Sequence, residues 1–149
     1  MRLVIQRVER AEVAVDGRVV GRIEGGLMVL AGFVEGDPDS CVPWAAEKLA
    51  ELRIFTDEAG KMNRSVRDVG GGVLLIPNFT LAGDAAKGRR PSFDRAMKPD
   101  RASVLFEELA SALVARGVVT EKGVFRAHMK VTLTNDGPVT IVVDSPTIG

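Results

Sequence analysis

Two short runs of consecutive apolar residues constrain the fold of this chain more than any other feature of its sequence. The first run covers residues 27–33 and the second covers residues 73–76. A short apolar run without polar alternation is typical of a β-strand that is buried on both of its faces. The sequence therefore predicts a central sheet that other parts of the chain cover on both sides.

Further strands are indicated where apolar and polar residues alternate, as they do in a half-buried strand. The alternation is longest from residue 124 onward, where His128 lies on the face opposite Phe125 and Met129. An Asp-Gly pair at 16–17 is a tight-turn signal between two shorter segments. We expect strands over 3–6, 13–15, 18–23, 53–56, 124–133 and 139–143, with a turn at 135–138.

Two segments carry apolar residues at helical spacing. The first follows a turn at 37–40, and the second is expected to be capped by Asp100 and to end at Gly117. A long polar loop at 82–99 separates the second helix from the preceding strand, and loops of this length are often functional. The predicted class is α+β, in which antiparallel and mixed sheets form a partly closed barrel with two helices packed on one side.

Composition excludes several classes of protein. The 149 residues are enough for one domain with its own core, and we expect 1–149 to form a single domain. Basic and acidic residues number 20 each, which excludes a nucleic-acid binder that depends on overall charge but not a local basic patch. No apolar run approaches the ~20 residues of a membrane helix, and the N-terminus turns polar too early for a signal peptide. We therefore expect a soluble cytoplasmic protein.

The sequence contains no clear set of residues for the common catalytic arrangements, such as a nucleophile with its base. His128 is the only histidine, and its position opposite the apolar face favours a solvated strand residue over a catalytic base. Cys41 lies near a helix start, where thiols can be activated, but without a base partner an ordinary semi-buried cysteine is favoured. One histidine and one cysteine exclude a disulfide framework and a His/Cys zinc site within one chain. The glycines at 70–72 precede a strand instead of opening a helix, so a phosphate loop is excluded.

Two segments remain as candidate sites. Residues 77–81 follow a buried strand, where polar groups stand at the rim of a core, although a plain strand end is the alternative. Residues 135–140 contain Gly137 before Pro138, and a bond before proline is where the cis form costs least. A simple hairpin connection is the alternative for this segment.

With these segments, the chain resembles the D-aminoacyl-tRNA deacylase family from Met1 to about Asp144. The most specific match is Asn-Asp-Gly-Pro-Val-Thr at 135–140, which looks like the family's second signature unchanged. The first signature is usually Ser-Gln-Phe-Thr and is Pro-Asn-Phe-Thr here, at 77–80; the retained Phe79 favours a strict D-specific member. Further matches lie at 6–8, 53–55, 60–63 and 90–93.

The resemblance implies an enzyme that hydrolyses the ester between a D-amino acid, or glycine, and the 3′ adenosine of tRNA. It implies a homodimer with the active site at the interface, no metal and no cofactor. It also implies that Gly137 and Pro138 form a cis pair, which enters the partner's pocket and rejects L-amino acids. An L side chain would meet this wall where a D-amino acid presents only hydrogen, so exclusion alone can discriminate.

The resemblance also assigns roles to single residues. Asn78, Phe79 and Thr80 are the expected catalytic group, with Phe79 against the terminal adenine or, alternatively, packed in the core. Because Thr80 has no histidine to deprotonate it, we expect direct attack by water, with backbone N–H groups near Phe79 and Thr80 stabilising the oxyanion and the ribose 2′-OH assisting proton transfer. The pocket and its support are expected to include Arg7, Gln6, Met129, Asn135, Val139 and Thr140. Arg7 is the candidate to brace the wall by hydrogen bonds to carbonyls, because an arginine among apolar neighbours needs a partner.

A local basic cluster supports an RNA substrate. Lys87, Arg89 and Arg90 are the expected tRNA contacts, in a loop that also carries Arg95, Lys98 and Arg101. A solvated loop of mixed charge is the alternative for this cluster. For the chain as a whole, the alternatives are a non-catalytic module that binds tRNA ends or nucleotides on the same fold, and a general small esterase.

Overall fold

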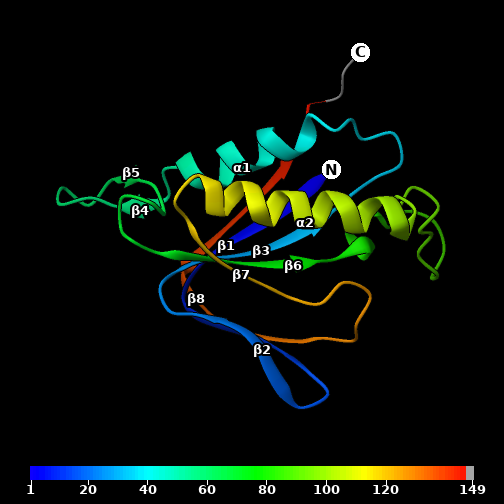
Figure 1. Cartoon of the computed structure of the whole chain (residues 1–149), viewed down its shortest axis with the longest axis horizontal. Coiled ribbons are helices and arrows are strands. Elements are labelled where there is room, and N and C mark those ends of the chain that lie inside the picture. The colour runs from blue at the N-terminus through cyan, green and yellow to red at the C-terminus, as the bar shows by residue number, and fades with distance from the viewer. Residues whose placement is uncertain (147–149) are drawn as a thin grey trace.

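The computed structural model describes residues 1–146, whose main feature is one mixed six-stranded sheet with two α-helices on one side (Figure 1). The strand order is β2-β1-β3-β6-β7, and β8 pairs with β1 outside this path. These strands are β1 Arg2–Val15, β2 Arg18–Ile23, β3 Gly26–Gly32, β6 Gly72–Pro77, β7 Val119–Lys122 and β8 Lys130–Asp144. The helices are α1 Cys41–Glu51 and α2 Pro99–Ala115. The predicted α+β class is confirmed.

The sheet curls into a partly closed barrel. The long strand β1 pairs antiparallel with β2, β3 and β8, whereas the β3–β6 and β6–β7 pairs are parallel. A Cβ atom on Gly21 of β2 would lie 3.1 Å from the Leu74 side chain and 3.1 Å from the Lys122 carbonyl oxygen. The strand β2 therefore folds back over β6 and β7, and the predicted barrel with two helices on one side is confirmed.

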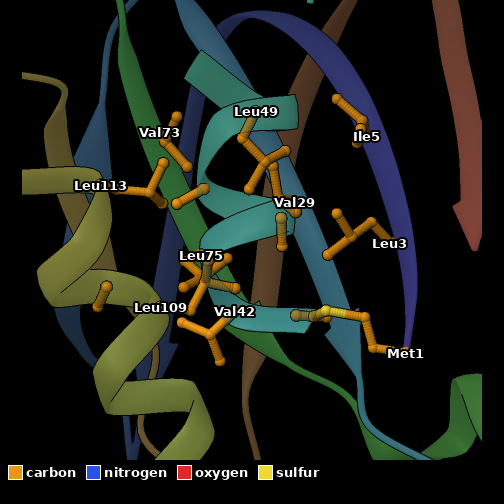
Figure 2. Packing of buried hydrophobic residues seen from close by; sticks show 14 of the residues in the cluster. Met1, Leu3, Ile5, Val29, Val42, Leu49, Val73, Leu75, Leu109 and Leu113 are labelled. Carbon is orange, nitrogen blue, oxygen red and sulfur yellow. The ribbon is translucent and has the colours of Figure 1, made fainter. Parts of the chain in front are cut away.

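The two central strands β3 and β6 are buried on both faces, as their apolar runs predict. Figure 2 shows the face toward the helices, where Leu3, Val29, Val73 and Leu75 pack against Leu49 of α1 and against Leu109 and Leu113 of α2. The opposite face fills the barrel with Val8, Ala11, Val13, Ile23, Met28, Leu74 and Ile76. Each fully buried large aliphatic side chain contributes about 1.5–3 kcal/mol, so these two layers hold the sheet in place.

The helices begin and end close to their predicted limits, with one correction. Lys98 is the N-cap of α2 and Pro99 occupies the first turn, so the expectation that Asp100 caps this helix is wrong. Proline suits this position because its missing N–H would have no partner inside the helix. Gly117 follows the helix with φ +80°, a conformation that glycine adopts without strain.

The predicted strand over 124–133 is wrong for its first half. Residues 123–129 form a connection, β8 begins at Lys130, and the chain forms β7 at Val119–Lys122 instead. The apolar residues Phe125, Ala127 and Met129 alternate like those of a strand, but they line a cavity. The strand expected at 53–56 is shorter, because only β4 Phe55–Thr56 pairs, in a small hairpin with β5 Met62–Arg64.

The predicted turn at 135–138 is a bulge inside the continuous strand β8. Gln6 pairs with Thr140 and Val8 pairs with Asn135, so residues 136–139 all stand opposite Arg7 alone. Pairing is regular from Gln6–Thr140 to Arg2–Asp144, whereas on the other side one more irregularity separates the Val8–Asn135 pair from Arg10–Thr134. The hairpin alternative for this segment is therefore wrong. Asp136, Gly137 and Pro138 are exposed and project from a strand that is paired at both ends, whereas Val139 is buried in the core.

Candidate active site

A cavity of about 680 Å³ opens where β6 ends and α2 begins. Figure 1 shows these two ends and the 123–129 connection at the same end of the molecule. Most of the lining is apolar, with four phenylalanines among it, and its polar side chains are Asn78, Lys98 and Arg126. Ligand sites commonly combine an apolar wall with a few polar groups in this way.

A one-turn 3-10 helix, η1 Phe79–Ala82, follows β6 and forms one side of the cavity. Asn78 is its N-cap, and its Oδ1 accepts hydrogen bonds from the Thr80 N–H at 3.2 Å and from the Thr80 hydroxyl at 2.5 Å. This bonding fixes the Asn78 side chain by its oxygen, and its NH₂ group forms no hydrogen bond within residues 1–146.

Close approach of η1 to strand β3 depends on Gly32. A Cβ atom at this position would lie 2.7 Å from the Leu81 Cβ and 2.8 Å from the Asn78 carbonyl oxygen. Any side chain here would push η1 outward. The position of Asn78 and Phe79 at the cavity therefore depends on a glycine in the neighbouring strand.

Phe79 lies at the rim of the cavity with 60% of its surface exposed. It meets Phe93 edge to face, with ring centroids 5.4 Å apart. The alternative that Phe79 packs in the core is therefore wrong. An exposed aromatic ring beside an apolar cavity can stack on a planar base.

Thr80 is exposed and lies next to the cavity lining, not in it. Its hydroxyl donates to Asn78, and within residues 1–146 no side-chain base accepts the proton of this hydroxyl. A serine- or threonine-type nucleophile needs such a base. The geometry is therefore that of a helix-capping pair, not of a nucleophile with its activating group.

The 123–129 connection supplies the opposite wall through Phe125, Ala127 and Met129. Gly123 allows this approach, because a Cβ atom there would lie 2.7 Å from the Met129 sulfur. The structure thus brings Asn78, Phe79 and Met129 to one cavity. Lys98, Ala102 and Phe93 also line it. The sequence marks Lys98 as part of the basic cluster and Phe93 as part of the family match at 90–93, whereas it contains no signal for Ala102.

The remaining expected residues form a second cluster around the β8 bulge. Arg7 donates through Nε to the Asp136 carbonyl oxygen at 2.9 Å and through Nη1 to the Ile54 carbonyl oxygen at 2.7 Å. The Asn135 side chain accepts from the Val139 N–H at 2.8 Å and donates to the Val139 carbonyl at 3.1 Å. This network holds the main chain of the bulge from both sides.

Two further members complete this network. Gln6 donates to the Thr140 hydroxyl at 3.1 Å, and Asn135 donates to the same oxygen at 3.3 Å. The Gly137–Pro138 peptide bond is cis, and both residues are exposed. Gly137 has φ +151°, and a Cβ atom on it would lie 2.7 Å from the Val139 nitrogen, so the bulge requires glycine there.

The two clusters do not share a cavity within one chain. Gly137, Pro138 and Arg7 are absent from the described lining of the Asn78–Phe79 cavity. The bulge projects from the β1–β8 pair, whereas the cavity lies at the end of β6. A site that uses both clusters therefore needs a second copy of the chain.

The other sequence candidates lie outside the cavity. Cys41 is buried at the start of α1, and burial, with a smaller effect of Asp37, raises the pKa of its thiol to about 11. His128 is exposed. Lys87, Arg89 and Arg90 are exposed on a loop whose ends meet at the Asp84–Ser92 bridge.

Residues 1–146 contain neither a cluster of metal-binding side chains nor a membrane-spanning helix. No group of three or more His, Cys, Asp or Glu side chains is arranged there to hold a metal ion. No helix in this part of the chain is long and apolar enough to cross a membrane.

Comparison with known proteins decides the family. The family model described as D-Tyr-tRNA(Tyr) deacylase matches residues 4–144. The chain belongs to this deacylase family. A D-aminoacyl-tRNA deacylase of Geobacter metallireducens is 55% identical over 146 residues, covering 98% of this chain and 97% of its own. The Thermus aquaticus protein of the same name is 55% identical, covering 97% and 95%.

Solved structures support the deacylase fold. A structure named c-Myc DNA Unwinding Element Binding Protein superposes with a TM-score of 0.91 at 35% identity, covering 99% of this chain and all of that one. A probable eukaryotic D-amino acid tRNA deacylase superposes with a TM-score of 0.85 at 20% identity, covering 97% and 98%. The resemblance drawn from the two signatures is confirmed, and with it the deacylase-like fold.

Proposed function

We propose that this chain hydrolyses the ester bond joining a D-amino acid, or achiral glycine, to the 3′ adenosine of tRNA. The observation that carries the proposal is the rim of the cavity, where exposed Phe79 stands beside the Asn78 amide. An aromatic face and an amide are the groups that recognise a nucleoside at an unpaired RNA end. Relatives 55% identical over nearly the whole chain bear the name D-aminoacyl-tRNA deacylase.

In this proposal the terminal adenine stacks on Phe79, and the ester lies over the first residues of η1. Water attacks the ester carbonyl carbon, and the tetrahedral intermediate then expels the ribose 3′ oxygen, which takes up a proton with help from the 2′-OH. The products are the free amino acid and tRNA with a free 3′-OH. The Phe79 N–H forms no hydrogen bond within residues 1–146, so it is free to stabilise the oxyanion.

The Thr80 N–H has a smaller part in this mechanism than its position in the motif suggests. It donates to Asn78 Oδ1 at 3.2 Å, which occupies it in the free protein. The Phe79 N–H is therefore the principal oxyanion donor. An aminoacyl ester is an activated ester, so one donor and an oriented water suffice for a modest rate.

Chirality is read by the bulge of a partner subunit in this proposal. The chain forms a homodimer in which Gly137 and Pro138 of each subunit enter the cavity of the other. The Arg7 and Asn135 hydrogen bonds hold this main chain still, so that a side chain on the L face of the substrate meets a fixed wall. Exclusion of this kind needs no favourable contact with the D side chain, which allows many amino acids as substrates.

The deciding assay compares D- and L-aminoacyl-tRNA charged with the same amino acid. We expect rapid loss of the D ester and at least about a hundredfold slower loss of the L ester, because a buried clash costs several kcal/mol. Equal rates would refute the chirality proposal. No turnover of either ester by protein that binds both would refute the enzyme.

Lys87, Arg89 and Arg90, exposed between the two ends of the Asp84–Ser92 bridge, are the proposed contacts to the body of the tRNA. Charge reversal at Arg89 and Arg90 is expected to weaken tRNA binding. It should also make the plot of log binding constant against log salt concentration less steep by about 1–2, because each phosphate contact contributes roughly 0.7–0.9 to the steepness. Binding titrations at several salt concentrations check this. An unchanged slope would move the tRNA to another surface. We further propose that 1–149 act as one domain in the cytoplasm.

The alternative is a module that binds tRNA ends or nucleotides without catalysis. It is favoured by one observation, the similarity at 35% identity to a protein named for binding a DNA unwinding element. The same assay separates the two, since a binding module would retain the intact ester.

A further inference from the structure

The Asn78–Phe79 cavity carries a local positive charge that the proposed reaction does not use. Lys98 and Arg126 both line it, and no acidic side chain is among its described lining residues. Basic and acidic residues are equal in number over the whole chain, so this excess is local. Both side chains belong to exposed residues, which puts the two charges at the rim of the cavity and not on its floor.

These two cations have no partner within residues 1–146. Neither forms a salt bridge there, which they share with other exposed cations such as Lys87, Arg89 and Arg90; what distinguishes Lys98 and Arg126 is that they line the cavity. Unpaired cations beside an apolar cavity favour a ligand that brings a negative charge to the rim.

Arg126 holds its position at a conformational cost. It has φ +66° and stands third in a turn closed by a hydrogen bond from the Ala127 N–H to the Val124 carbonyl at 3.2 Å. Glycine is the residue that favours a left-handed φ at this point of a turn. An arginine at this position makes the turn less stable than glycine would. Its side chain lines the cavity, as do those of its neighbours Phe125 and Ala127.

The proposed substrate identifies the anion. Its amino acid has no free α-carboxylate, because this group forms the ester, and its α-amino group is repelled by cations. The nearest negative charge to the adenosine is the phosphodiester on its 5′ side. A guanidinium and an ammonium suit a phosphodiester, since charge-assisted hydrogen bonds to phosphate are among the strong ones.

We propose that Arg126 and Lys98 bind the phosphodiester that joins the terminal adenosine to the preceding nucleotide, and so distinguish an RNA 3′ end from a free aminoacyl nucleoside. This inference rests on the proposed function, because it takes the nucleoside at Phe79 as given. It makes Arg126 and Lys98 substrate-positioning residues that act on KM and not on the chemical step.

The test compares two ligands that differ by one nucleotide: adenosine and the dinucleotide cytidylyl-(3′→5′)-adenosine. Binding of both is measured by calorimetry, and hydrolysis is measured with their 3′-D-aminoacyl esters. We expect the wild-type protein to prefer the dinucleotide, and Arg126→Gly and Lys98→Gln each to reduce this preference about tenfold, in Kd and in KM, as loss of one charge-assisted hydrogen bond predicts.

The variants are chosen to preserve the fold. Glycine suits the φ of residue 126, so the thermal midpoint of Arg126→Gly should equal or exceed that of the wild type. Lys98 makes no side-chain capping bond, so Lys98→Gln removes a charge and no cap. Arg18→Ala, at the exposed start of β2, is the control for charge lost elsewhere and should keep the full preference.

The outcomes separate the two proposals. A dinucleotide preference that depends on Arg126 and Lys98 supports the inference even if neither ester is hydrolysed, which would refute only the proposed enzyme. Hydrolysis with equal preference in wild type and variants would overturn the inference and leave the enzyme standing. Inorganic phosphate that binds at the same residues as tightly as the dinucleotide would also overturn it, since the site would then be a free-phosphate site.

Discussion

At the scale of single residues, the Thr80 hydroxyl is bound to its own helix cap. It donates to Asn78 Oδ1 and meets no base within residues 1–146. We expect Thr80→Ala to keep kcat within about tenfold of wild type, because only one capping hydrogen bond of about 1 kcal/mol is lost. Single-turnover hydrolysis of D-aminoacyl-tRNA measures this. A fall of several orders of magnitude would show that the hydroxyl is the nucleophile.

Asn78 provides the matched comparison at the same site. Asn78→Ala removes the oxygen to which Thr80 donates and the amide NH₂ group of a residue that lines the cavity. Its effect on hydrolysis should therefore exceed that of Thr80→Ala, and most of it should be in KM. A smaller effect would remove Asn78 from the binding of the substrate.

Burial makes the thiol of Cys41 less reactive than an exposed thiol. Burial first, and the charge of Asp37 second, raise the pKa of its thiol to about 11. A raised thiol pKa favours the protonated form, so at pH 8 roughly one thiol in a thousand is a thiolate. We expect labelling by a thiol reagent at pH 8 to be at least about a hundredfold slower in the native protein than in denaturant. Equal rates in the two states would contradict the buried position of Cys41.

At the scale of elements, the contact between β3 and η1 is sensitive to a single methyl group. Gly32→Ala would bring a Cβ atom within 2.8 Å of the Asn78 carbonyl oxygen. We expect a loss of stability of about 1–3 kcal/mol, as in other overpacked sites, together with lower kcat/KM because Asn78 and Phe79 shift. Denaturant unfolding and steady-state kinetics measure the two effects. Gly25→Ala is the control, because a Cβ atom there meets nothing within 4 Å.

The elements also mark how far the sequence alone predicts this structure. The sequence predicts strands β3 and β6 because a strand buried on both faces is a continuous apolar run. It predicts both helices because a helix buried on one side carries apolar residues at helical spacing. It does not predict the connection at 123–129, since Phe125, Ala127 and Met129 alternate around a cavity as they would along a strand. Gly123 and the left-handed turn at Arg126, which decide that path, depend on contacts with β6 and within the turn that no local pattern reveals.

At the scale of the whole molecule, the separation of the cavity from the bulge predicts complementation between subunits. Phe79→Ala damages the cavity, and Gly137→Ala distorts the bulge, because its Cβ atom would clash with the Val139 nitrogen. A heterodimer of these two variants, isolated with two affinity tags, should keep about half the wild-type activity and full rejection of L esters, because one of its two sites is intact.

The homodimers are the internal controls for this experiment. We expect the Phe79→Ala dimer to be weakly active and the Gly137→Ala dimer to lose discrimination between D and L esters. If cavity and bulge of one chain formed the site, the heterodimer would discriminate no better than the Gly137→Ala dimer. Such a result would refute the shared site, which sequence reasoning could reach only through family resemblance.

The four-against-one bulge in β8 has a consequence for how such a protein can change. In most strands, adding or removing one residue turns every later side chain to the opposite face of the sheet. Here the pairs Gln6–Thr140 and Val8–Asn135 pin the strand on either side, and the residues between them carry no pairing of their own. The exposed positions Asp136 and Pro138 can therefore change while the barrel keeps its register, provided that Gly137 and the Asn135–Val139 hydrogen bonds are kept. Substrate selection can then diverge while the scaffold that presents it keeps its structure.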